Sequence, residues 1–270
     1  SVVPKEDLLN AVGLQSAVFN AASTVGPALA GITVDRVGLP ANFFLNAISF
    51  LAVLVALLSL RSTKSSRQIK RPKLINRIAE ALVTVKRDSI LPWLLLSYGV
   101  LLFSGPSLPL LLPVLAVRNL HISASDLGFL FSAAGLGAVL GAVAMASLSD
   151  KVQKSPIVFG AFALWTSSLI FVAFSNAVLP AFVALIALGM SQNVVGTVTS
   201  TLLQLCVPHD QRGRVLSLNT LLIHGRARLG DFPAGLFISM WGPFTAAAGA
   251  MIVGLTALFV FIRSLALRSF

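Results

Sequence analysis

The sequence contains few charged residues, a single cysteine, and far fewer acidic than basic residues. Only 11% of the 270 residues are charged, whereas water-soluble globular proteins carry about 25%. So little charge cannot cover a water-exposed surface, which excludes a soluble globular domain and a disordered segment. The lone Cys206 excludes a disulfide framework within the chain. Nine acidic against twenty basic residues leave a net charge of +11, so the position of the basic residues becomes informative.

Long apolar runs make up most of the chain, with 56% hydrophobic residues and a mean hydropathy of +0.91. About twenty apolar residues span a bilayer as a helix, and the sequence contains eight such stretches. A membrane β-barrel needs apolar and polar residues in alternation, and runs such as residues 50–58 do not alternate. The sequence therefore predicts an all-α membrane protein. The eight predicted spans are residues 11–34, 39–60, 90–114, 127–148, 156–174, 179–206, 215–240 and 244–262.

The basic residues lie mostly in one set of alternate connections. Sixteen of the twenty belong to this set, nine of them in residues 61–87, and only Arg36 and Arg118 belong to the other set. By the positive-inside rule, the segment 61–89 and the C-terminus are expected in the cytoplasm. This distribution explains the charge without nucleic acid, because the linker lacks the interleaved aromatic residues that stack bases.

A weak internal repeat suggests duplicated halves, with matches offset by 204 residues. Val3 and Pro4 correspond to Val207 and Pro208, and the pair Gly26 and Gly31 to Gly230 and Gly235. On this pattern we expect two spans before the basic linker and six after it, out of a full set of twelve. The predicted units are residues 1–60, the end of the N-terminal half; residues 61–89, the linker; and residues 90–270, the C-terminal half.

Three segments resemble motifs of the major facilitator superfamily. The first span carries Gly13, Ala22, Gly26-Pro27 and Ala30-Gly31, which is similar to the antiporter motif of the fifth helix. Residues 146–154 resemble the cytoplasmic loop motif, with Ala146 and Gln153 where the motif has glycine. Residues 207–215, with Arg212, Gly213 and Arg214, are similar to the loop that enters the eleventh helix in the bacterial drug and siderophore exporters, the branch of enterobactin and macrolide exporters.

The resemblance implies a helical bundle whose fifth to twelfth helices are present and which exports small amphipathic molecules by alternating access, with proton antiport. An uptake symporter and a non-functional fragment remain alternatives. An enzyme or the membrane subunit of an ATP-driven pump is disfavoured, because the sequence contains no phosphate-binding loop, zinc-protease motif or nucleophile elbow. No cofactor or metal is expected, and the expected partners are a small-molecule substrate, a proton and the lipid bilayer. A monomer is expected.

The first span carries the features of a close helix contact. Pro27 cannot donate a backbone hydrogen bond, and Gly13, Gly26 and Gly31 let a second helix approach closely. The resemblance assigns these residues to a seam that seals when the cavity faces inward, and ordinary helix packing is the alternative. The family places a glycine-rich helix opposite, here with Gly128, Gly135, Gly137 and Gly141.

A charged turn follows the fourth predicted span. Lys151 and Lys154 fit a solvated cytoplasmic loop, whereas Asp150 could pair with a base or cap a helix in one state and release it in the other. We therefore interpret Asp150, Lys151 and Lys154 as a cytoplasmic latch, with a simple solvated loop as the alternative.

The seventh predicted span contains four ionisable residues, His224, Arg226, Arg228 and Asp231. Charges inside a bilayer are costly and face protein or water, so one hypothesis is an anion-attracting or proton-responsive site in the cavity. The alternative is that the helix starts late and these charges lie near its cytoplasmic end. The amides Gln192 and Asn193 could contact substrate, although amides equally hold helices together.

Overall fold

The computed structural model describes residues 8–59, 91–103, 107–148, 154–206 and 231–268, together with residues 217, 220–222 and 225. All secondary structure in these residues is helical, which confirms the predicted all-α fold. The helices are α1 (Leu8–Val37), α2 (Leu39–Ser59), α4 (Leu91–Phe103), α5 (Leu108–Leu115), the π-helical η1 (Ala116–Leu120), α6 (Ala124–Ser147), α7 (Lys154–Ala173), α8 (Val178–Cys206), α10 (Asp231–Trp241) and α11 (Phe244–Arg268).

Four helical segments in the described residues are long and apolar enough to cross a membrane. Two shorter apolar segments accompany them, at Leu108–Leu120 and Phe244–Ala257. The exposed positions include many large apolar side chains, among them Phe43, Phe171 and Leu255, as expected where lipid is the solvent. The long segments are Leu39–Ser59, Ala124–Ser147, Pro156–Ala173 and Val178–Leu203.

One predicted span differs from a single continuous helix. The span predicted over residues 90–114 consists of α4 and α5, because Ser107 has an extended backbone (φ −65°, ψ 156°) and starts a new helix whose first turn contains proline. In the span predicted over residues 215–240, the described residues before residue 226 are helical, and α10 follows from Asp231 with Pro233 in its first turn. Proline suits the first turn of a helix, where its missing N–H has no intrahelical acceptor.

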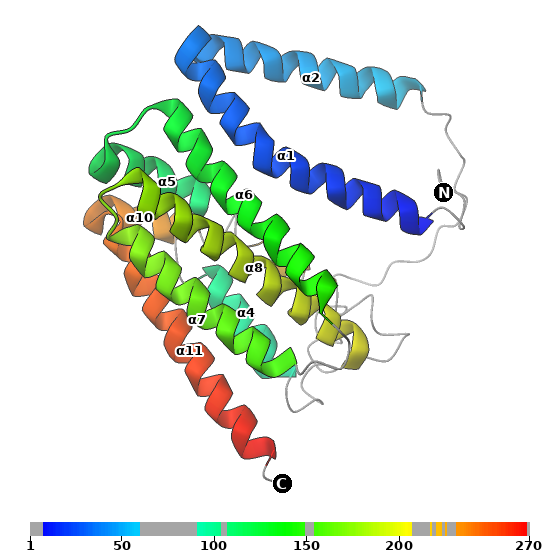
Figure 1. Ribbon diagram of the computed structural model, residues 1–270, viewed down its shortest axis with the longest axis vertical. Coiled ribbons are helices and arrows are strands. Elements are labelled where there is room, and N and C mark those ends of the chain that lie inside the picture. The colour runs from blue at the N-terminus through cyan, green and yellow to red at the C-terminus, as the bar shows by residue number, and fades with distance from the viewer. Residues whose placement is uncertain are drawn as a thin grey trace.

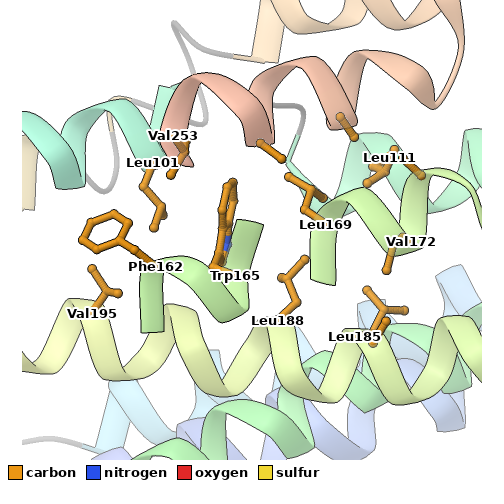
Figure 2. Close-up of a cluster of buried hydrophobic side chains, with 14 of the residues drawn as sticks. Leu101, Leu111, Phe162, Trp165, Leu169, Val172, Leu185, Leu188, Val195 and Val253 are labelled. Carbon is orange, nitrogen blue, oxygen red and sulfur yellow. The ribbon is translucent and has the colours of Figure 1, made fainter. Parts of the chain in front are cut away.

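The apolar core lies where α7 packs between α8 and α11. Figure 2 shows Phe162, Trp165 and Leu169 of α7 directed between α8 below and α11 above, with Leu185 and Val195 on the α8 side. Leu185 and Val195 are completely buried, and burial of such side chains contributes about 1.5 to 3 kcal/mol each in water-soluble proteins. In a bilayer the same contacts act through close packing instead.

The first two helices form a hairpin beside the remaining bundle (Figure 1). Gly38, with φ +95°, makes the tight turn between α1 and α2, a backbone conformation that glycine adopts without strain. The hairpin meets the bundle through α1, which runs along α6, while α2 packs on α1 and has no buried residue. The α1–α6 contact therefore joins the hairpin to the rest of the described bundle.

Candidate functional site

The contact between α1 and α6, which we call the seam, is a backbone-to-backbone approach at three glycines. A methyl group on Gly31 would lie 2.9 Å from Ser125 Cα, and one on Gly135 would lie 2.8 Å from the carbonyl oxygen of Ser23. A methyl group on Gly128 would collide with the carbonyl oxygen of Pro27. Distances under 3.0 Å do not occur for real Cβ atoms, so only glycine fits at these positions.

A hydrogen bond across the middle of the seam involves the residue after the proline. The backbone N–H of Ala28 donates to the hydroxyl oxygen of Ser132 on α6, at 3.1 Å. Pro27 itself has no N–H and crowds the preceding turn of α1, which makes this region suited to hydrogen bonding outside its own helix. Ser132 lies four residues after Gly128 and three before Gly135, on the same face of α6.

The glycines predicted for the seam do not all lie in it. Gly31 contacts α6, whereas a methyl group on Gly26 would meet no atom within 4 Å. Gly13 lies in the first turns of α1, and its surroundings are outside the described residues. On α6, Gly128 and Gly135 face α1, but Gly137 and Gly141 face Ile186 and Met190 of α8. The glycine run of α6 therefore serves two different contacts.

Asp35 connects α1 to α6 at the end of the seam nearest the α1–α2 turn. This residue was not among the site residues predicted from the sequence. The Asp35 carboxylate accepts hydrogen bonds from the backbone N–H groups of Ala124 (3.2 Å) and Ser125 (2.8 Å), and from the Ser125 hydroxyl. These donors form the N-terminus of α6, where N–H groups have no intrahelical partner. The hydroxyl of Ser125, and then its N–H, lower the pKa of Asp35 below its ordinary value.

A second polar contact joins the start of α5 to the first turn of α10. Ser107, the residue that precedes α5, donates to the Asp231 carboxylate from its backbone N–H (3.2 Å) and from its hydroxyl (2.9 Å). Ser107 is buried, and Asp231 is half-buried in the first turn of α10. Of the four ionisable residues predicted in this region, Asp231 is placed by the structure at a helix start and bonded to a different helix.

The amides of α8 face its neighbour α6. The Asn193 side chain is half-buried, and its Cβ lies 3.3 Å from the position of a methyl group on Gly141. Its amide oxygen accepts a hydrogen bond of 3.4 Å from the Thr197 hydroxyl, one turn along the same helix. Gln192 is also half-buried. Asn193 therefore takes part in helix packing, as one of the two interpretations expected.

Several predicted site residues fall outside the described residues. They are Asp150 and Lys151 of the cytoplasmic latch, the loop residues Arg212, Gly213 and Arg214, and the charged residues His224, Arg226 and Arg228. Lys154 begins α7, and its side chain is likewise outside the description.

Local sequence signals mark the helix start that Asp35 contacts, but not Asp35 itself. The segment Ser123-Ala124-Ser125-Asp126 has the pattern of a helix start, and the Ser123 hydroxyl does accept from the Asp126 N–H at 3.2 Å. Asp35 lies at the end of the preceding hairpin helix, but its pairing with residues about ninety positions away has no signature in the sequence.

The long apolar helices and the glycine-lined seam define a multi-pass membrane protein built from closely packed helices. The chain belongs to the transmembrane secretion effector family, whose family model matches residues 1–269. This confirms the predicted superfamily and its secretion branch, and it places the chain with transporters rather than enzymes.

Its curated relatives include enterobactin exporters. The enterobactin exporter EntS of Citrobacter koseri is 26% identical over 272 residues, covering 94% of this chain and 62% of the relative. EntS of Escherichia coli O1:K1 is 26% identical, with 97% of this chain and 64% of the relative covered. EntS of Shigella boydii serotype 18 is also 26% identical, with the same coverage of 97% and 64%. The chain thus spans less than two thirds of the length of these relatives.

Proposed function

We propose that the chain serves the export of small amphipathic molecules, of the siderophore or drug type, across the bacterial inner membrane. The observation that carries this proposal is the seam, where Gly31, Gly128 and Gly135 bring two helix backbones together. A backbone contact of this kind has two discrete states, closed or separated, because its surfaces interlock and cannot slide gradually. The relatives named as enterobactin exporters support the direction of transport and suggest enterobactin as the first substrate to test.

In this proposal the hairpin of α1 and α2 ends one six-helix half, residues 90–270 form the other, and residues 61–89 link them in the cytoplasm. Rocking of the halves would open a midplane cavity alternately to each side. The seam, with Pro27 and Gly31 on α1, closes the outer side while the cavity faces inward. Two charged loops would hold the cytoplasmic side closed in the opposite state. One loop contains Asp150, Lys151 and Lys154, and the other contains Arg212, Gly213 and Arg214.

We propose Asp231 as the proton-coupling group of this half. The carboxylate joins α10 to the start of α5, at the place where the span predicted over residues 90–114 is interrupted. Transporters place ion and substrate sites at such interrupted helices, where free backbone groups and helix ends are available. Protonation would remove the charge of Asp231 and weaken its two bonds from Ser107, which would free α5 and α10 to move apart.

A second candidate is an anion site in the sequence segment just before Asp231. His224, Arg226 and Arg228 precede Asp231, and together they add positive charge to a segment whose span is otherwise apolar. A siderophore that carries negative charge would be attracted by them. The binding of an uncharged substrate would not be changed by these positive charges.

The test is export in a bacterial strain that lacks its own siderophore and drug exporters. Expression of the intact transporter should lower the cell content of enterobactin, and a protonophore should abolish the effect. Asp231→Asn should abolish proton-driven export and leave protein amount and substrate binding unchanged. Asp126→Asn, which removes a carboxylate from another helix start, is the matched control.

The other possible outcomes would either point to a different transport activity or contradict part of the proposal. Cell content that rises with the proton gradient would indicate an uptake symporter, and export that follows ATP with the gradient intact would indicate a pump subunit. A transporter that folds but moves no substrate would contradict the proposal. Export that persists in Asp231→Asn would contradict the coupling role of Asp231 alone.

A further inference from the structure

The seam ends in a carboxylate that bonds across two helices. Asp35, in the last turn of α1, receives two backbone N–H groups and a hydroxyl from the first residues of α6. The side chain is exposed, so it is not needed to fill a core position. Its bonds exist only while the ends of α1 and α6 are together.

The chemistry of this contact is that of a helix cap supplied by another helix. Free N–H groups and the helix dipole make the start of α6 favourable for an anion. The helix already has a cap of its own, because the Ser123 hydroxyl accepts from the Asp126 N–H. The bonds of Asp35 therefore contribute little to the formation of α6 itself. Their main effect is to hold the ends of α1 and α6 close together.

The charge state of Asp35 decides whether acid could open this contact. Hydrogen bonds from Ser125 lower the pKa of Asp35, and a smaller effect of desolvation raises it. The contact therefore stabilises the closed seam at every pH above the ordinary pKa near 3.8, and this stabilisation disappears only as pH falls through the lowered value. The other charged or titratable groups at this end are Arg36, Arg118, His121 and Asp126.

We propose that Asp35 is a positioning residue of the transport cycle, a clamp that holds the α1–α6 seam closed at its outer end. The clamp is released when the two halves separate, and not by protonation of Asp35. The inference rests on the proposed export function for its place in the cycle. The coupling proton must then bind a group other than Asp35, because a carboxylate that stays charged near neutral pH does not take up and release a proton during transport.

Spin labels on the two helices test the clamp directly in the intact transporter. Val37 at the end of α1 and Phe129 in the second turn of α6 are both exposed, so cysteines there accept labels in a Cys206→Ser background. Asp35→Asn should increase the population with separated labels about fivefold, because the amide keeps the shape and loses the charge. Asp35→Glu should restore most of the closed population.

The controls separate the clamp from a general effect on folding. Asp126→Asn removes a carboxylate from the same helix end but bonds only within α6, and it should leave the label distance unchanged. Acidification from about pH 7.5 to about pH 5.5 should also leave it unchanged. If Asp35→Asn does not fold, Ser125→Ala removes one donor to the clamp and should give a smaller shift in the same direction.

The outcomes are distinct for the clamp and for export. An unchanged label distance in Asp35→Asn and in Ser125→Ala, an equal shift in Asp126→Asn, or opening at about pH 5.5 would each overturn the clamp. If the label distance shifts as expected while the wild type exports nothing, the clamp stands and the proposed export fails. If export occurs, Asp35→Asn should lower its maximal rate more than it changes the apparent KM, because the clamp does not touch substrate.

Discussion

The two packed faces of α6 use the same residue type for different contacts. On the α8 side the glycines are reciprocal, since Gly137 of α6 meets the carbonyl oxygen of Ile186 and Gly189 of α8 meets that of Ala134. On the α1 side the glycines are reciprocal as well, since Gly31 of α1 meets Ser125 of α6 and Gly128 of α6 meets Pro27. This contact also carries hydrogen bonds between helices, from Ala28 to Ser132 and from α6 to Asp35.

The difference indicates which contact is permanent. Side chains of α6 and α8 belong to the buried core, whereas none of the described residues of α1 does, so separating α6 from α8 would open that core. The α1 side depends partly on polar bonds near the helix ends, which water can replace when the helices separate. We therefore expect changes on the α8 face to unfold the bundle and changes on the α1 face to affect transport first.

The largest effect is expected for Gly137→Val. The side chain would collide with the backbone of Ile186 and Met190, where a whole helix must move to make room. We expect a loss of about 3 kcal/mol or more in stability and poor recovery of folded protein. Thermal unfolding in detergent measures this, with Gly160→Val as the control, because a side chain at Gly160 would meet nothing within 4 Å. Equal melting temperatures for the two variants would refute the permanent contact.

Gly128→Val tests the other face of α6. The added side chain would meet Pro27 and Gly31 and hold α1 away from α6, while the α8 face remains intact. We expect folded protein with export reduced by about tenfold, measured as siderophore efflux per amount of transporter in the membrane. Gly160→Val again serves as the control, and a variant that unfolds like Gly137→Val would remove the distinction between the two faces.

The smallest effect is expected for Ser132→Ala. The substitution removes the acceptor of the Ala28 N–H, and hydrogen bonds between membrane helices contribute about 0.6 kcal/mol on average. Export should fall by less than about threefold, with little change in melting temperature. Ser167→Ala is a suitable control, because the Ser167 hydroxyl bonds only to Leu164 within its own helix. A loss of export as large as that of Gly128→Val would show that the bond, and not the close approach, dominates the seam.

Much of the fold followed from local patterns. Apolar runs of about twenty residues correctly indicated helices, and the Gly-Pro pattern around Pro27 correctly marked α1 as unusual. Hydropathy could not locate the interruption at Ser107, because the residues on both sides of it are largely apolar. Nor could the pattern assign each glycine to a neighbour, since Gly135 and Gly137 are two positions apart and face different helices.

The sequence by itself determined that the chain is helical, lies in a membrane and belongs among the transporters, since these properties depend on hydropathy, charge count and short motifs. Only the tertiary structure decided which surfaces meet. The bonds of Asp35 to α6, and of Ser107 to Asp231, join residues separated by 89 or more positions. Such pairs depend on how helices are placed relative to one another, and that placement results from the packing of many side chains and not from any one segment.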